Sequence, residues 1–134
     1  MSTLITYFSK TGNSKNVALR LAEELGATLD EIAFDEKAHT ISDNAESPAE
    51  YNRVVLVCPI WAFNLPEPMS LYLKRHKDAI KQYSLIVTCS LGGLRGCVRG
   101  STRILGHAPD QALKLKAKAV KSGSYSLEAF SRDK

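Results

Sequence analysis

A run of hydroxyl, amide and glycine residues near the start of the chain has the composition of a phosphate-binding loop. The run comprises Ser9, Lys10, Thr11, Gly12, Asn13 and Ser14. Its side chains offer hydrogen-bond donors, and its glycine lets the backbone approach a ligand closely. An apolar run over 4–8 precedes it, and a helical repeat of apolar residues over 17–25 follows it. Free N–H groups and the helix dipole attract anions at a helix start, so the stretch predicts a phosphate site, with Lys10 or Lys15 close by.

Two widespread phosphate-binding motifs are absent from this stretch. It contains no GxxxxGK(S/T) sequence, and Gly12 is its only glycine, so the dinucleotide motif GxGxxG is also absent. A second interpretation stays open, in which the polar side chains only cap the helix that starts here.

The order Ser-x-Thr-Gly-Asn-Ser after a first strand resembles the phosphate loop of the flavodoxin family, and the resemblance continues in register along most of the chain. It implies an α/β doubly wound fold with a flavodoxin-like five-stranded parallel sheet in the order 2-1-3-4-5. It also implies that the cofactor is FMN. Ligands of such open sheets bind at the carboxyl ends of the strands, where the strand order reverses. The loops after the third and fourth strands therefore complete the expected site.

The loop after the third strand carries the only tryptophan of the chain. It comprises Pro59, Ile60, Trp61, Ala62, Phe63 and Asn64. The segment resembles the Pro-Ile-Trp loop of many small flavodoxin-like proteins. An indole offers a large flat surface for stacking on the isoalloxazine ring, and the flanking prolines stiffen the loop. The alternative is that Trp61 and Phe63 are ordinary core or hinge aromatics.

The loop after the fourth strand is expected to contact the pyrimidine edge of the ring. It comprises Ser90, Leu91, Gly92 and Gly93, whose glycines allow backbone N–H groups to come close. Many flavodoxins carry Tyr or Trp here, and this chain has neither. Leu91 takes that place, or one face of the ring stays exposed. Cys58 and Cys89 are predicted to be buried core thiols rather than a redox pair.

Composition predicts one globular domain over residues 1–134. The hydrophobic fraction of 44 % and the charged fraction of 24 % are ordinary for a soluble protein with a single core. No apolar run is long enough to cross a membrane. The cysteines lack CxxC spacing, which predicts reduced thiols and a cytoplasmic location. The scattered histidines show no ligand spacing, so no metal site is expected.

The net charge of +4 departs from the family, because flavodoxins are usually acidic and many dock redox partners through acidic patches. The late cations are Arg95, Arg99, Arg103, Lys114, Lys116, Lys118 and Lys121. No nucleic-acid recognition motif accompanies them, so a solvated basic face is expected and nucleic-acid binding is not. A chain with a net positive charge opposes the negative charge that the flavin gains on reduction less strongly than an acidic chain does. We therefore expect a second reduction potential less negative than in acidic flavodoxins.

Hydrophobic periodicity divides the chain into strands and helices. Strands are predicted over 2–8, 28–34, 53–58 and 84–89, and helices over 13–25, 66–76 and 94–105. Residues 35–50 are predicted to be a loop, with one short helix around 47–51. Apolar residues alternate with lysines over 113–119, which predicts an edge strand with one wet face.

The C-terminal helix of the family is predicted to be truncated or absent, because only residues 124–134 follow the last strand. Without it, apolar residues of the middle strands lack cover on one face. We expect Tyr125, Leu127 and Phe130 to fold back as a stub, or a second copy of the chain to cover the patch as a homodimer. If the stub forms, deleting 124–134 lowers the stability.

Together these expectations describe an FMN-binding electron-transfer protein whose partners are redox proteins, with no role for nucleic acid or membrane. The flavin would supply the chemistry, so no residue is assigned a catalytic role. Two alternatives stay open: an NAD(P)H-dependent quinone or FMN reductase on the same fold, and a flavin-free binding scaffold of the same shape. Nicotinamide oxidation would identify the first, and a failure to bind FMN would identify the second.

Overall fold

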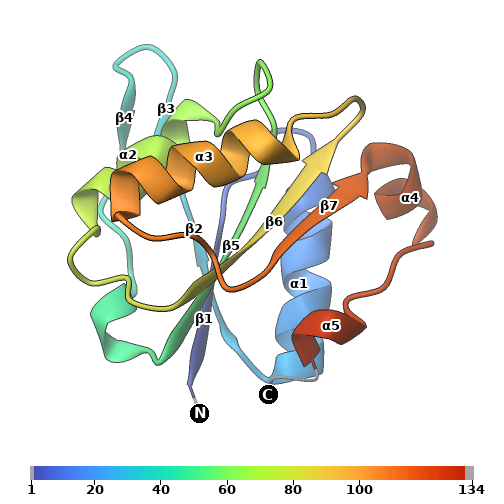
Figure 1. Cartoon of the computed structure of the whole chain (residues 1–134), viewed down its shortest axis with the longest axis horizontal. Coiled ribbons are helices and arrows are strands. Elements are labelled where there is room, and N and C mark those ends of the chain that lie inside the picture. The colour runs from blue at the N-terminus through green and yellow to red at the C-terminus, as the bar shows by residue number, and fades with distance from the viewer. Residues whose placement is uncertain (1, 132–134) are drawn as a thin grey trace.

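Five strands form one parallel sheet through the middle of the molecule (Figure 1). The structure is a computed structural model that describes residues 2–131. The strands of the sheet are β1 (Thr3–Tyr7), β2 (Thr28–Glu31), β5 (Arg53–Pro59), β6 (Tyr83–Cys89) and β7 (Ala112–Lys116). Their spatial order is β2-β1-β5-β6-β7, and every neighbouring pair is parallel. Numbered within the sheet alone, this order is 2-1-3-4-5, which confirms the predicted doubly wound α/β fold.

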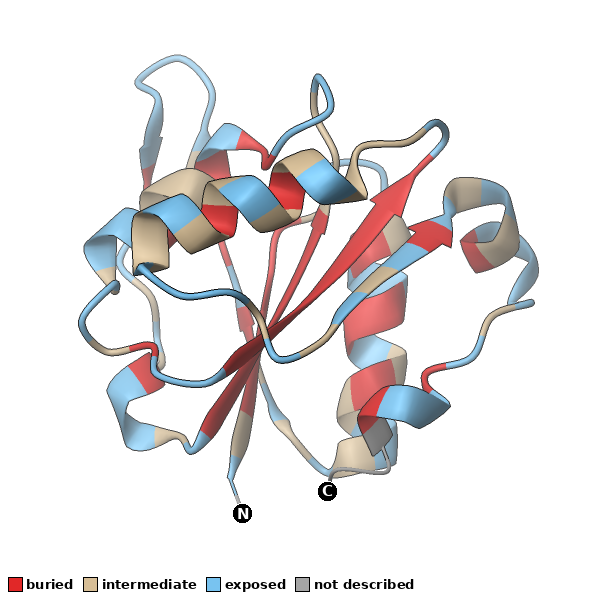
Figure 2. Ribbon diagram, viewed as in Figure 1, coloured by how far each residue is buried: buried red, intermediate tan, exposed pale blue. Residues whose placement is uncertain are grey.

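Helices cover both faces of this sheet, which explains why the central strands are apolar throughout. Helices α2 (Glu67–Arg75) and α3 (Leu94–Leu105) lie on one face and pack on the side of β5 that carries Val54 and Leu56. Helix α1 (Asn13–Leu25) lies on the other face, on the side that carries Val55 and Val57. Figure 2 shows the central strands as the most continuously buried part of the chain. Among the described helices, none is both long and apolar enough to span a bilayer.

A small hairpin follows β2 where a loop was predicted. It consists of β3 (Phe34–Asp35) and β4 (Thr40–Ile41), which pair antiparallel, and the short helix η1 (Pro48–Glu50) comes after it. Strands of two residues leave no periodic signal in a sequence, so the hydrophobic pattern did not reveal them. The short helix lies where it was predicted.

The predicted edge strand over 113–119 is too long at its C-terminal end. Strand β7 ends at Lys116, and Ala117 begins helix α4 (Ala117–Ser122). The last pair in the register joins Cys89 of β6 to Lys116, so the neighbouring strand offers no further residues for pairing. The alternation of apolar residues and lysines continues past Lys116, but the pairing of β7 with β6 does not.

The end of the chain covers the face that a longer C-terminal helix would occupy. Helix α4 and helix α5 (Glu128–Ser131) lie beside α1, and Val120, Leu127 and Phe130 are buried in the cluster that α1 forms with the sheet. Arg53, at the start of β5, donates to the Phe130 carbonyl at 3.4 Å. The predicted stub is therefore confirmed, and the C-terminal helix is truncated. The homodimer stays a prediction.

Candidate functional site

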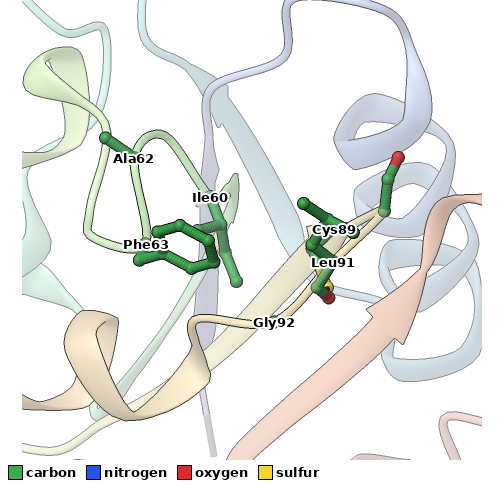
Figure 3. Close-up of a pocket in the computed structure, with 7 residues that line it drawn as sticks. Ile60, Ala62, Phe63, Cys89, Leu91 and Gly92 are labelled. Atoms are coloured by element: carbon green, nitrogen blue, oxygen red, sulfur yellow. Dashed lines mark hydrogen bonds between the residues drawn. The ribbon is translucent and has the colours of Figure 1, made fainter.

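Three loops meet at the carboxyl ends of β1, β5 and β6 and surround two adjoining hollows. The larger, of about 260 Å³, is lined by Ile60, Ala62, Phe63, Cys89, Ser90, Leu91 and Gly92 (Figure 3). The smaller, of about 170 Å³, is lined by Lys10, Thr11, Asn13, Pro59, Ile60, Trp61, Thr88, Cys89, Ser90 and Ala117. Ile60, Cys89 and Ser90 line both hollows, so the two adjoin, and together they are called the depression below. The structure brings together residues from all three segments singled out in the sequence, although Ser9, Gly12, Ser14, Asn64 and Gly93 line neither hollow.

The first loop leaves the start of α1 open to a ligand. Gly12 adopts a left-handed conformation with φ 96°, and its N–H donates to Ser9 Oγ at 3.0 Å. The Asn16 N–H donates to the Gly12 carbonyl at 3.0 Å. The N–H groups of the helix before Asn16 therefore have no acceptor inside the helix, and no side chain caps them. Amides in this position are suited to an anion, because the helix dipole adds to their partial charge.

Ser14 differs from its neighbours in the first loop because its side chain faces the sheet. It is buried, and its hydroxyl shares a hydrogen bond of 3.0 Å with the Thr88 hydroxyl of β6. This bond fixes the start of α1 against the strand that also leads into the third loop. Ser14 therefore lines neither hollow, and its side chain supports the start of α1 from beneath.

Trp61 lines the smaller hollow, beside the first loop. Its ring meets Phe8 edge to face, with centroids 5.4 Å apart, and the Lys10 ammonium lies 5.4 Å from its centroid. Lys10 also forms an exposed ion pair of 3.0 Å with Glu36 of the β3–β4 hairpin. The indole therefore connects the first and second loops, and Lys10 is already partnered on the protein.

The larger hollow lies between two exposed apolar side chains, Phe63 and Leu91. Their exposed fractions are 61 % and 73 %, and Figure 3 shows them projecting from different loops toward the space between. Phe63 stands on a tight turn in which Trp61 and Asn64 exchange two backbone hydrogen bonds of 3.0 Å. Ala62 and Phe63 have φ values of 51° and 62°, as in a type I′ turn. Left-handed conformations at residues with side chains are strained and cluster at functional sites.

A row of glycines on α3 supports this turn, and the sequence analysis did not find it. A Cβ atom on Gly96 would lie 2.0 Å from the Phe63 carbonyl oxygen. One on Gly93 would lie 2.8 Å from Ile60, and one on Gly100 would lie 2.9 Å from the Asn64 side-chain oxygen. Gly96 and Gly100 share one face of α3, and Gly93 precedes the helix as its N-cap. At Gly96 only glycine leaves room for the backbone of the turn. The spacing of the three glycines, by three and four residues, is the signal that the sequence held.

The cysteines beneath the site are buried and free, as predicted for Cys58 and Cys89. Burial raises the pKa of Cys97 to about 12 and raises the pKa of Cys58 well above its ordinary value. Both thiols therefore stay protonated at neutral pH. Cys89 reaches both hollows and donates its S–H to the Leu91 carbonyl at 3.0 Å, which ties the third loop to the end of β6.

The β3–β4 hairpin is joined to α2 by a pH-dependent contact. His39 Nδ1 lies 2.8 Å from a carboxylate oxygen of Glu67, and this hydrogen bond, together with the charge of Glu67, raises the pKa of His39 above 6.5. Because the pKa of His39 is raised, its contact with Glu67 stabilises the folded protein fully below pH 6.5. This contribution is lost as the pH rises through the pKa that His39 has in the folded protein.

We expect Glu67→Gln to lower the pKa of His39, as followed by NMR titration of the imidazole. Glu36→Gln serves as the control, because it removes the neighbouring pair with Lys10 and leaves the His39 contact in place. An imidazole that titrates alike in the parent and in Glu67→Gln would contradict the pairing.

Comparisons with known proteins agree with this architecture. The flavodoxin domain family matches residues 4–120. A flavoprotein of Lactobacillus acidophilus in complex with FMN superposes with a TM-score of 0.75 at 17% identity, covering 92% of this chain and 99% of that chain. A flavoprotein of Bacteroides eggerthii gives a TM-score of 0.71 at 17% identity, with coverage of 91% and 94%. Oxidised flavodoxin 1 of Bacillus cereus gives 0.61 at 15% identity, with coverage of 99% and 96%.

The comparison with curated protein sequences found no match. The solved structures are too distant in sequence to show more than a shared fold. The family match spans most of the chain and includes all three loops of the depression. It confirms the resemblance carried by the Ser-x-Thr-Gly-Asn-Ser loop, and the chain belongs to the flavodoxin domain family.

Proposed function

We propose that this chain binds FMN in the depression at the carboxyl ends of β1, β5 and β6 and serves as an electron carrier. One observation carries the proposal: of two adjoining hollows, one lies beside uncapped amides at the start of α1 and the other forms an apolar space between Phe63 and Leu91. FMN has the matching chemistry, with a dianionic phosphate at one end and a flat, largely apolar ring at the other. The Lactobacillus acidophilus flavoprotein, which is a complex with FMN, has the same fold.

The residues present fit such a ligand at both ends. At the phosphate end, the N–H groups at the start of α1 are uncapped and the Thr11 side chain is exposed, so both can donate to a phosphate. At the ring end, Phe63 and Leu91 offer apolar surface, and the third loop offers backbone groups after Ser90. Trp61 lies between the two ends, where it also packs on Phe8. A bound flavin supplies the redox chemistry, and the protein supplies binding, orientation and a defined electrostatic environment.

The proposal is tested by titrating the purified chain with FMN and following the fluorescence of Trp61. Because Trp61 is the only tryptophan, any quenching reports on the depression itself. Riboflavin, which lacks the phosphate, is the matched control ligand. We expect saturable quenching by FMN and much weaker binding of riboflavin. A chain that stays colourless with excess FMN would overturn the assignment and favour the flavin-free scaffold.

Phe63→Ala is expected to weaken FMN binding by about tenfold, which corresponds to about 1.4 kcal/mol. Phe63 is mostly exposed without a ligand, so its removal leaves the folded protein intact and subtracts apolar contact from the bound state. Leu19→Ala is the control, because Leu19 is a large hydrophobic residue on α1 with an exposed fraction of 46 %. Equal affinities for Phe63→Ala and the parent chain would remove Phe63 from the site.

The second reduction potential of the bound flavin is expected to be less negative than in acidic flavodoxins. The net charge of +4 opposes the added negative charge less than an acidic protein does. A redox titration of the FMN-loaded protein gives the value directly, and a potential as low as in acidic flavodoxins would refute the argument. Oxidation of NAD(P)H by the same sample would instead favour a reductase. We further propose a cytoplasmic location, where the free cysteines stay reduced.

A further inference from the structure

The five cations between positions 95 and 116 gather on one side of the molecule. Arg95, Arg99 and Arg103 are exposed on α3 at intervals of four residues, so they form a single stripe along the helix. Lys114 and Lys116 are exposed on the edge strand β7, whose alternate residues Leu113 and Leu115 turn toward α1. The two lysines therefore face the side of the sheet that α3 covers. These five residues are called the basic face below.

Within residues 2–131, the basic face has no acidic side chain paired with it. None of its five cations forms an ion pair with any residue of the described chain. Asp110 is the only acidic residue between positions 91 and 127. The opposite edge of the sheet has the reverse charge, because positions 30–50 hold seven acidic residues and one lysine, Lys37. The modest net charge therefore conceals a strong separation of charge across the sheet, from the β2 edge to the β7 edge.

The basic face reaches the rim of the depression. Arg95 follows the third loop directly, four residues after the exposed Leu91. Lys116 pairs in the register with Cys89, which lines both hollows, and the next residue, Ala117, lines the smaller one. Figure 2 shows the outward side of α3 and much of β7 exposed on the same side of the molecule. Exposed apolar side chains bordered by polar or charged residues are typical of protein interaction sites, in which arginine is enriched.

We propose that the basic face, with Leu91 and Phe63 at its edge, is the docking surface for an acidic electron-transfer protein. The reason for docking beside the flavin rests on the proposed function, but the charge complementarity does not. A nucleic acid is a poorer match, because positions 84–124 hold no Phe, Tyr or Trp, so that no aromatic side chain lies among the five cations and only Phe63, at the edge of the surface, could stack on a base. A second copy of the chain, docked through its own acidic edge, would give an open head-to-tail array rather than a closed pair.

The test uses plant-type ferredoxin, a small acidic iron–sulfur protein, as the probe, and cytochrome c, a small basic haem protein, as its counterpart. Each is added to the isotope-labelled chain, with and without FMN, at ionic strengths of about 0.01 M and about 0.3 M. We expect ferredoxin, and not cytochrome c, to shift amide resonances of α3 and β7, and we expect its affinity to fall as salt is added. The variant Arg95→Gln/Arg99→Gln/Arg103→Gln is expected to bind it about tenfold or more weakly.

The matched control is Lys74→Gln/Lys77→Gln/Lys81→Gln, which removes the same charge from exposed residues that precede β6, at the amino end of that strand. Its affinity should stay within about twofold of the parent chain. The proposal is overturned if the control loses as much affinity as the arginine variant or if cytochrome c binds as well as ferredoxin. It is equally overturned if a single-stranded oligonucleotide binds more tightly, or if sedimentation shows that the chain associates with itself through this face. Because the titration is also made without FMN, a failure to bind flavin is seen separately.

Discussion

Replacing Gly96 by alanine is expected to weaken FMN binding by at least about tenfold and to lower the free energy of unfolding by about 1–3 kcal/mol. A new Cβ atom would lie 2.0 Å from the Phe63 carbonyl oxygen, so the Trp61–Asn64 turn has to move away from α3. That turn carries Phe63, and its residues line both hollows. Helix propensity acts in the opposite direction, because alanine is favoured over glycine inside a helix by about 1 kcal/mol.

Gly100→Ala is the matched control for this substitution. It makes the same change in the same helix, but its Cβ would meet the end of the Asn64 side chain at 2.9 Å rather than a backbone carbonyl. The Asn64 amide can move at the cost of the hydrogen bond that its oxygen accepts from the Leu65 N–H, and helix propensity offsets that cost, so we expect FMN affinity close to that of the parent chain and stability within about 1 kcal/mol of it. FMN titration and chemical denaturation measure both quantities. If Gly96→Ala also kept its stability and its affinity, α3 would not be the support of the turn.

The double substitution Leu127→Ala/Phe130→Ala is expected to lower the free energy of unfolding by about 4 kcal/mol or more. Both side chains are fully buried between α1 and the sheet, and a small domain is stable by only about 5–15 kcal/mol in total. Their contributions overlap because the two side chains belong to one cluster. The C-terminal stub thus supplies the apolar cover for this face of the sheet.

Ser124→Ala/Ala129→Ser provides the control, since both positions are exposed in the same segment. Urea denaturation followed by circular dichroism gives the stability of each variant. Should the double variant not fold, Phe130→Leu tests the same contact more mildly and should cost about 1 kcal/mol. The FMN affinity of the folded variants should not change, because Phe130 contacts Arg53, at the other end of β5 from the depression. A double variant as stable as the control would show that the stub is dispensable.

Sequence periodicity predicted the elements of the sheet wherever burial on both faces imposed a long apolar run. The runs over 53–58 and 84–89 correspond to β5 and β6, and the helical repeats over 13–25 and 94–105 correspond to α1 and α3. Periodicity failed where pairing with a strand distant in the sequence determined the end of an element. The alternation over 113–119 is the clearest case, because the end of β6, and not the local pattern, sets where β7 stops.

The supports of the site were harder to predict than its loops. The phosphate-loop, Trp61 and Ser90–Gly93 segments all line the depression, because parallel strands end at the same edge of a sheet. Gly96, by contrast, lies on a helix face of small residues whose packing partner the sequence does not reveal. Its role depends on a carbonyl group contributed from more than thirty positions earlier in the chain, and a helical pattern contains no information about such a contact. The sheet-facing hydroxyl of Ser14 was missed for the same reason, since its partner is Thr88.

The strained turn at Ala62 and Phe63 sets a limit on how far this protein can adapt to heat. Both residues hold backbone conformations that Asn followed by Gly adopts with far less strain. Selection for thermal tolerance alone would drive the pair toward Asn-Gly, and the phenyl ring beside the larger hollow would disappear with it. A lineage that keeps Phe63 must therefore find its extra stability elsewhere in the fold, and this turn records which of the two demands has prevailed.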